Sequence, residues 1–241
     1  MTTTGTPHYD GKVVVVTGAS RGVGHAVSRY FLRHGARVIG FARGGPTIDD
    51  AAYTHFAVDI GNAKEVQDAF RQIANEFPTV DIVINNAAVL TSQYAMILPA
   101  HNAQEMVNTN LLGTFFVSRE AAKIMRKAKT GRIINIGSMA ARLEPMGDSI
   151  YAACKAAVST LANVMAKEFS SFNVTCNTLG ITAIDTDMLA QLPRDKVDAI
   201  VAALPVPRYA TEDDIFNVLD FFAAERSAQI TAQTVFLGGV N

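Results

Sequence analysis

Short apolar runs alternate with amphipathic stretches along most of the chain. The run at residues 12–17 (KVVVVT) is β-branched and continuously apolar, which is typical of a strand buried on both faces. Residues 63–77 instead place Val66, Ala69, Phe70 and Ile73 on one helical face. Further strands are predicted at residues 37–41, 55–58, 81–84, 132–136, 173–177 and 233–237, and further helices at 25–34, 104–127, 149–169 and 211–224.

This unbroken alternation of strands and helices predicts an α/β fold with a doubly wound parallel sheet of about seven strands. Residues 11–241 are expected to form one domain, preceded by a flexible tail at residues 1–10. Residues 186–208 are expected to form a mobile, partly helical lid over the site, ended by prolines. The stretch 149–169 is apolar almost all round, so its second side needs a partner. We therefore expect a homo-oligomer, a dimer or tetramer, formed through this helix and residues 108–127.

Composition excludes several classes of function. Charged residues make up 18% of 241 residues and the net charge is −1, which argues against a nucleic-acid surface or a basic membrane patch. No apolar stretch reaches the length of about 18 residues that a membrane helix needs. The two cysteines and five histidines show no ligand spacing, so no metal is expected. The sparse cysteines and the lack of a signal peptide favour the cytoplasm.

A glycine-rich turn follows the first predicted strand and precedes a helix. Gly18, Gly22 and Gly24 have the spacing G-x-x-x-G-x-G, which lets backbone N–H groups approach a pyrophosphate at a helix N-terminus. Taken alone, this spacing also fits a simple tight turn. No acid occurs at residues 36–46 to hold a ribose 2′-hydroxyl, whereas Arg43 and Arg21 suit a 2′-phosphate. NADP(H) is therefore favoured over NAD(H), unless Arg43 is a solvated loop charge.

Tyr151 and Lys155 lie four residues apart and would share a helical face. Ser138 comes thirteen residues earlier, at the end of a predicted strand, and completes a candidate proton-transfer group. The alternative is an ordinary amphipathic pair. A serine-hydrolase elbow is excluded because the second glycine of G-x-S-x-G is missing after Ser138.

Seven motifs in order resemble the short-chain dehydrogenase/reductase family over essentially the whole chain. They are T-G-A-S-R-G-V-G (17–24), V-D-I (58–60), N-N-A-A (85–88), Asn110, Ser138, Y-x-x-x-K (151–155) and I-D-T-D-M (184–188). Within the family, the arginine pair and P-V-P-R (205–208) are most similar to NADPH-dependent 3-oxoacyl-(acyl carrier protein) reductases and related ketoreductases. The resemblance implies a Rossmann fold and reduction of a ketone on a small-molecule or carrier-bound substrate.

The resemblance also implies a role for each matching residue. Asn110, Ser138, Tyr151 and Lys155 would be the catalytic tetrad, with Tyr151 as general acid/base and Asn110 anchoring a water. The cofactor contacts would be Gly18, Ser20, Arg21, Gly22, Val23, Gly24, Arg43, Asp59, Ile60, Asn86, Ala87, Ala88, Tyr151, Lys155, Ile184 and Thr186. Asp59 and Ile60 would hold the adenine, Asn86 the ribose, and Ile184 and Thr186 the carboxamide.

Two positions depart from the family pattern. Ala88 replaces a glycine, which is tolerated if its φ is negative. Ile181-Thr182 replaces the usual Pro-Gly beside the nicotinamide.

The predicted substrate loop at residues 139–149 carries Arg142, Glu144 and Asp148. These charges favour a polar carbonyl, such as a sugar-like compound or keto acid, unless they point to solvent. Two alternatives to a ketoreductase therefore stay open: an NAD(P)-dependent dehydrogenase that oxidises a sugar or polyol, and a nucleotide-binding regulator without activity.

Overall fold

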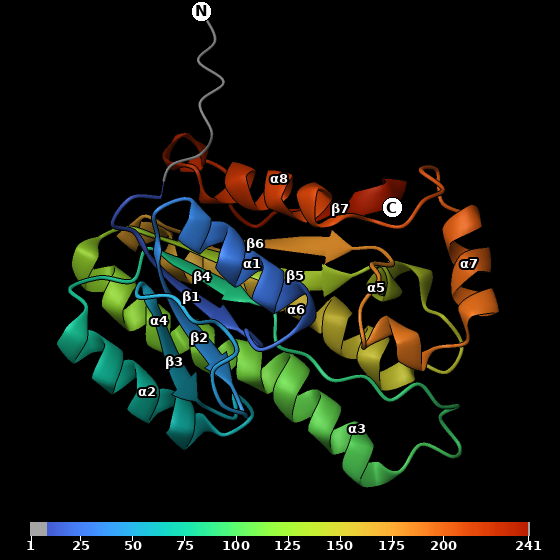
Figure 1. Ribbon diagram of the computed structural model, residues 1–241. Helices are drawn as coiled ribbons and strands as arrows, with labels where there is room; N and C mark the ends of the chain where they lie inside the picture. Colours follow the sequence, from blue (N-terminus) through green and yellow to red (C-terminus); the bar gives the residue numbers. More distant parts are fainter. Residues whose placement is uncertain (1–8, 241) are drawn as a thin grey trace, which may run out of the picture.

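Seven parallel strands form one sheet in the order β3-β2-β1-β4-β5-β6-β7 (Figure 1). This computed structural model describes residues 9–240. The strand order reverses between β1 and β4, and ligands of open α/β sheets bind at such a switch point. The strands are β1 Val13–Thr17, β2 Arg37–Ala42, β3 Tyr53–Ala57, β4 Ile82–Asn85, β5 Gly131–Ser138, β6 Val174–Ile181 and β7 Thr234–Phe236.

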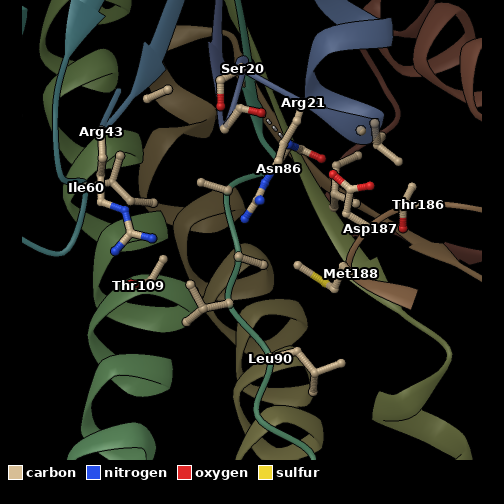
Figure 2. Close-up of a pocket in the computed structure, with 18 of the residues that line it drawn as sticks. Ser20, Arg21, Arg43, Ile60, Asn86, Leu90, Thr109, Thr186, Asp187 and Met188 are labelled. Carbon is tan, nitrogen blue, oxygen red and sulfur yellow. Dashed lines mark hydrogen bonds between the residues drawn. The ribbon is translucent and has the colours of Figure 1, made fainter. Parts of the chain in front are cut away.

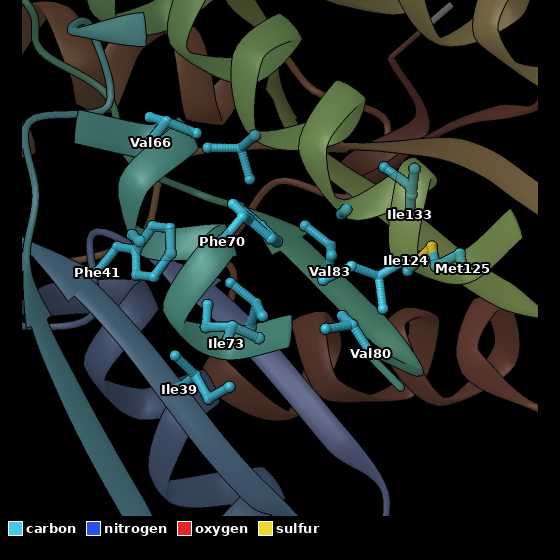
Figure 3. Close-up of a cluster of buried hydrophobic side chains, with 14 of the residues drawn as sticks. Ile39, Phe41, Val66, Phe70, Ile73, Val80, Val83, Ile124, Met125 and Ile133 are labelled. Atoms are coloured by element: carbon cyan, nitrogen blue, oxygen red, sulfur yellow. The ribbon is translucent and has the colours of Figure 1, made fainter. Parts of the chain in front are cut away.

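Helices cover both faces of the sheet. Val13 and Val15 of β1 pack into a cluster with α2, α4 and α6, while Val14 and Val16 pack with α1 and α8 on the opposite face. Figure 3 shows part of the first cluster, where α2 lies against the sheet. This arrangement explains why β1 is apolar from Val13 to Val16. The α-helices are α1 Gly22–Arg33, α2 Ala63–Glu76, α3 Ala100–Met106, α4 Thr114–Ala128, α5 Ala140–Leu143, α6 Ser149–Phe169, α7 Arg194–Ala202 and α8 Glu212–Ala223.

Several predicted boundaries are confirmed and others shift. The helix predicted at 149–169 is α6 with the same limits, and α1 begins three residues before the predicted start. The helix predicted at 104–127 is a continuous rod of α3, the π-helical turn η1 (Val107–Gly113) and α4. The segment predicted as a lid contains the 3-10 turn η3 (Leu189–Gln191) and α7. The other 3-10 turns are η2 Ser170–Phe172, η4 Glu225–Ser227 and η5 Leu237–Gly239.

The predicted tail at residues 1–10 is wrong at Tyr9. Residues 1–8 lie outside the part of the chain that the structure describes, but Tyr9 is buried. Its hydroxyl donates to Asp220 Oδ1 at 2.6 Å, and the Tyr30 hydroxyl donates to Oδ2 of the same carboxylate at 2.6 Å. The sequence pattern missed this contact because Asp220 lies 211 residues further along the chain.

The expectations for membrane and metal can be compared with residues 9–240. No helix in this range combines the length and apolar character that crossing a bilayer requires. Within the same range, no group of three histidine, cysteine or acidic side chains is arranged to hold a metal ion. Cys154 and Cys176 are buried free thiols.

Candidate functional site

The carboxyl edge of the sheet opens into a cleft of about 410 Å³. Segments that follow β1, β2, β4 and β6 line it, together with residues of α6 and of the α3–η1 rod (Figure 2). Most residues predicted for the site line this cleft; those that do not are Gly24, Asn110 and Ser138. These predicted residues are far apart in sequence, so the strand order is what brings them together.

The glycine turn is built for a close backbone approach. Gly18 has φ +69°, and a Cβ there would lie 2.9 Å from the Ala87 Cα. A Cβ at Gly24 would lie 2.2 Å from the Gly18 carbonyl oxygen, so that position admits no side chain. The Thr17 hydroxyl oxygen accepts from the backbone N–H groups of Asn86 and Ala87, both at 3.0 Å, and joins β1 to β4.

Helix α1 starts directly beneath this turn without a side-chain cap. Its N-cap is Arg21, which is extended and forms no side-chain cap hydrogen bond. The first N–H groups of α1 are therefore available to a ligand, and the helix dipole favours a negative one. An uncapped helix N-terminus beside glycines with no room for a side chain fits the pyrophosphate of a dinucleotide.

The end of β2 carries a cation and no acid. Arg43 follows Ala42, the last residue of β2, and lines the cleft with Arg21 and Ser20 (Figure 2). The Arg43 guanidinium donates to Glu105 Oε1 at 3.3 Å, across the mouth of the cleft. Glu105 belongs to α3 and had no role in the sequence-based site.

The predicted adenine and ribose residues surround the same end of the cleft. Asp59 accepts from the Gly61 N–H at 2.9 Å, so its carboxylate orders the turn after β3. Ile60 is buried against Gly113 of η1. The Asn86 amide donates to the Thr17 carbonyl at 3.0 Å, which fixes the side chain against the glycine turn. Ala88 lines the cleft and does not adopt a positive φ, as its tolerance required.

Tyr151 and Lys155 lie on one face of α6 at the inner end of the cleft. They are 8% and 4% exposed, and the Lys155 Nζ lies 5.8 Å from the centre of the Tyr151 ring. Nζ also donates to the Ile136 carbonyl of β5 at 2.8 Å. Ser138 ends β5, and its hydroxyl oxygen accepts from the Ala140 N–H at 3.1 Å. That bond occupies an oxygen lone pair and leaves the Ser138 hydroxyl proton to donate, toward Tyr151 in this structure.

Burial shifts both ionisable groups away from their charged forms. The pKa of Tyr151 is raised to about 12: burial is the largest cause, a hydrogen bond from Ser138 opposes it, and the charges of Asp148 and Cys154 add to the rise. Burial also lowers the pKa of Lys155 to about 8, and Cys154 opposes this shift. At neutral pH the phenol is therefore protonated and most of the lysine is an ammonium. Such an arrangement can deliver a proton to a substrate oxygen.

Asn110 sits inside the π-helical turn and holds the loop after β4. Its Oδ1 accepts from the Val89 N–H at 2.8 Å, and its Nδ2 donates to the Val89 carbonyl at 2.9 Å. The side chain is 1% exposed and does not line the cleft. Single π-helical turns inside α-helices often occur at functional sites. The predicted link from Asn110 to a water stays a prediction.

The opposite wall consists of residues after β6. Thr186 donates to the Ile184 carbonyl at 3.3 Å, and both line the cleft with Met188 and Asp187 (Figure 2). Ile181, the last residue of β6, also lines the cleft. Thr182 is buried, and its methyl group lies against Gly238. Ile181 thus ends the strand beside the cleft, and Thr182 packs against the segment that follows β7.

The charges of the predicted substrate loop divide into two groups. Arg142 and Glu144 are exposed, as the solvent alternative proposed. Asp148 is 7% exposed; burial raises the pKa of its carboxyl group, and a hydrogen bond from Ser92 lowers it. The loop is joined to the segment after β4, because the Gln93 N–H donates to the Gly147 carbonyl at 2.8 Å.

Sequence reasoning missed several cleft residues. Leu90, Thr109 and Glu105 contribute to the wall formed by the α3–η1 rod and the loop after β4 (Figure 2). None of these residues belongs to a motif. In the sequence, Glu105 looks like an ordinary acidic residue on the solvent-exposed face of a helix. The π-helical turn also carried no signal, since a π turn and an α turn differ by one hydrogen-bond step rather than by composition.

Comparison with known proteins agrees with the fold. A family model described as short chain dehydrogenase matches residues 12–197. Two similar curated proteins are 3-oxoacyl-(acyl-carrier-protein) reductases. The one from Vibrio cholerae is 34% identical, covering 96% of this chain and 98% of the relative. The one from Escherichia coli is 32% identical over the same shares.

Solved structures show the same architecture. Ligand-free aldohexose dehydrogenase from Thermoplasma acidophilum has a TM-score of 0.88 at 25% identity, covering 96% of this chain and 94% of that chain. A putative gluconate dehydrogenase from Agrobacterium tumefaciens has a TM-score of 0.87 at 27% identity, with 96% of each chain covered. The family match spans far more than half of the residues and the curated relatives align along nearly their full length, so this chain belongs to the short-chain dehydrogenase/reductase family of oxidoreductases.

Proposed function

We propose that the protein is an NADPH-dependent ketoreductase that reduces a ketone to a secondary alcohol, with Tyr151 as the general acid. The observation that carries the proposal is the buried Tyr151–Lys155 pair at the inner end of a cleft whose outer end fits a dinucleotide. A nicotinamide nucleotide, when bound, supplies the hydride that adds to the substrate carbon. The curated relatives described as 3-oxoacyl-(acyl-carrier-protein) reductases support this direction of reaction.

Each polar residue then has one task at the substrate oxygen. Ser138 donates a hydrogen bond to that oxygen as negative charge develops on it. Tyr151 transfers its phenolic proton to the same oxygen, which completes the alcohol. The Lys155 ammonium stabilises the phenolate that remains. Asn110 holds the loop at Val89 that borders the substrate side of the cleft.

Preference for NADPH rests on the charges near the end of β2. Arg43 and Arg21 line the cleft where an adenosine 2′ group would lie, and β2 ends in Ala42 without an acid. A guanidinium can bind phosphate oxygens bidentately. Arg43→Asp should therefore lower the affinity for NADPH and raise it for NADH. Binding titrations with both nucleotides test this, and equal affinities of the wild type for the two would refute the preference.

A second candidate is an NAD(P)-dependent dehydrogenase that oxidises a sugar-like or polyol alcohol. Asp148, three residues before Tyr151, favours it because its buried Oδ1 has no hydrogen-bond partner among the described residues, and a carboxyl oxygen can accept from a hydroxyl. The structural resemblance to proteins described as aldohexose and putative gluconate dehydrogenases favours it as well. Because the cleft is open, its shape does not distinguish a ketone carried on an acyl carrier protein from a small polar carbonyl compound.

Nicotinamide absorbance across a panel of ketones, acyl thioesters, sugars and polyols distinguishes these candidates. The ketoreductase predicts NADPH oxidation by a ketone or a 3-oxoacyl thioester. Tyr151→Phe should abolish it while NADPH binding stays nearly unchanged. Turnover by this variant at the wild-type rate would refute the mechanism, and absence of any wild-type turnover would favour a regulator.

We also propose a homo-oligomer formed through α6 and the η1–α4 segment. The outer face of α6 exposes Ala153, Ala156, Thr160 and Val164, which are small or apolar side chains at helical spacing. Leu112 of η1 is likewise an exposed apolar side chain. Val164→Arg should convert the oligomer into a smaller species in analytical ultracentrifugation, whereas a monomeric wild type would refute the proposal.

A further inference from the structure

Two residues with opposite charges face each other across the mouth of the nucleotide cleft. Arg43 follows β2 on one wall, and Glu105 lies on α3 in the opposite wall, 62 residues later. The Arg43 Nη1 lies 3.3 Å from the Glu105 Oε1. Figure 2 shows the guanidinium of Arg43 directed toward the helical segment that carries Thr109.

The carboxylate of Glu105 has access to the position where an adenosine 2′ group would lie. Glu105 lines the nucleotide cleft and also a neighbouring cavity of about 300 Å³ beside Asp59 and Asn62. The side chains of Arg43 and Glu105 are 61% and 49% exposed, so both can change rotamer when a ligand arrives. The ion pair therefore forms without a ligand, and both side chains remain able to move away from each other.

This pairing has a different consequence for each nucleotide. A 2′-phosphate needs the guanidinium donors that Glu105 occupies, and it also brings negative charge close to a carboxylate. A 2′-hydroxyl is neutral and places no such demand on Arg43. The ion pair therefore costs binding free energy with NADPH and little with NADH.

We propose that Glu105 is a specificity-determining residue for the cofactor: its carboxylate competes with the 2′-phosphate of NADPH for Arg43 and so limits the preference for NADPH over NADH. This inference rests on the proposed assignment of Arg43 to the 2′-phosphate. It concerns the size of the preference rather than its direction. The chain lacks an acid at the end of β2, and Glu105 supplies one from the opposite wall.

The test compares the nucleotide affinities of the wild type and Glu105→Gln. Dissociation constants for NADPH and NADH are measured by fluorescence titration, and those for 2′,5′-ADP and 5′-ADP by calorimetry. Since exposed ion pairs have modest energies, the variant should bind NADPH and 2′,5′-ADP about twofold to fivefold more tightly. Its affinities for NADH and 5′-ADP should not change. The gain should shrink as salt is raised, because exposed charges are screened.

Two controls separate competition for Arg43 from a general effect of charge. Glu76→Gln removes one exposed acid from α2, away from the cleft, and should leave all four affinities unchanged. In an Arg43→Gln background, Glu105→Gln should no longer favour the 2′-phosphate, because the contested guanidinium is absent. Thermal unfolding of each variant checks that the fold is kept.

Three results would overturn the inference: no gain in NADPH affinity, an equal gain for NADH, or the same gain in the Arg43→Gln background. The wild-type ratio of NADPH to NADH affinity tests the proposed function separately. A wild type without any preference would contradict that function, yet Glu105→Gln would still report whether the carboxylate opposes a 2′-phosphate.

Discussion

Replacing Lys155 with methionine should abolish activity without destabilising the folded protein. Lys155 is 4% exposed, and burial lowers the pKa of its ammonium from 10.5 to about 8. Since one pKa unit corresponds to about 1.36 kcal/mol, keeping this group charged in the folded state costs about 3 kcal/mol at neutral pH. Methionine has a similar length and removes that cost.

The lost hydrogen bond offsets part of the gain. Nζ donates to the Ile136 carbonyl at 2.8 Å, and leaving a buried acceptor without a partner costs about 1–3 kcal/mol. The variant should therefore be more stable than the wild type by about 0–2 kcal/mol, which corresponds to a rise of up to about 8 °C in Tm for a domain of this size. Turnover should fall at least about 100-fold, because the proposed mechanism uses Lys155 to stabilise the Tyr151 phenolate.

The direction in which stability changes with pH is an independent test of the buried Lys155 charge. Between pH 8 and 10.5 Lys155 keeps its proton in the unfolded chain but loses it in the folded protein, so the free energy of unfolding should rise with pH. Below pH 8 the cost is fully present and constant. Tyr151 acts in the opposite direction, because its raised pKa of about 12 makes stability fall between pH 10 and 12. Burial also raises the pKa values of Cys154 and Cys176, so these thiols make stability fall as the pH approaches and passes 9. The difference in stability between the wild type and Lys155→Met, followed from pH 7 to 9.5, therefore isolates Lys155.

Urea unfolding followed by circular dichroism measures these differences, since the chain contains no tryptophan. Protein concentration is kept constant because association shifts apparent stability. Lys196→Met, at an exposed position of α7, is the matched control and should change stability by less than about 0.5 kcal/mol. A loss of more than about 1 kcal/mol in Lys155→Met at pH 7, or no rise in the stability of the wild type relative to Lys155→Met toward pH 9.5, would refute the buried-charge reasoning.

Three further changes have outcomes that the structure specifies. Gly18→Ala forces a side chain into a positive-φ position 2.9 Å from the Ala87 Cα, so nucleotide affinity should fall at least about tenfold in fluorescence titration, with loss of about 1–2 kcal/mol of stability; unchanged affinity would contradict the close approach. Asn110→Ala removes both hydrogen bonds to Val89 and should cost about 1–3 kcal/mol in chemical unfolding, with lower kcat; wild-type stability and kcat would contradict the clamp. Asp220→Ala leaves two tyrosine hydroxyls without their shared acceptor and should cost about 2–4 kcal/mol in the same assay; a change below about 0.5 kcal/mol would show that this junction contributes little.

Local patterns predicted what depends on neighbours in sequence. The run of β1 needed no distant partner to be recognised, because burial on both faces favours consecutive apolar residues such as Val13–Val16. Helix α6 has the predicted limits, and Tyr151 and Lys155 share its face because residues four apart always do in an α-helix. The glycine turn was also readable, since Gly18 needs a positive φ and Gly24 has no space for a Cβ.

Contacts between distant segments were decided by the tertiary structure. Tyr9 was predicted as tail, yet it is buried because α8 brings Asp220 to it. Asn110 was assigned from a motif, but its partner Val89 emerged only once the loop after β4 crossed the π-helical turn. Glu105 carried no sequence signal, because its partner Arg43 belongs to the opposite wall of the cleft.

The sequence by itself thus determined the order of strands and helices, the dinucleotide turn and the pairing of Tyr151 with Lys155. The tertiary structure decided how deeply that pair is buried, which charges meet across the cleft and which pKa values follow. The physical reason is the distance over which each effect acts. Periodicity and backbone geometry depend on residues that are close in the sequence, whereas burial and electrostatics depend on residues that the fold brings close in space.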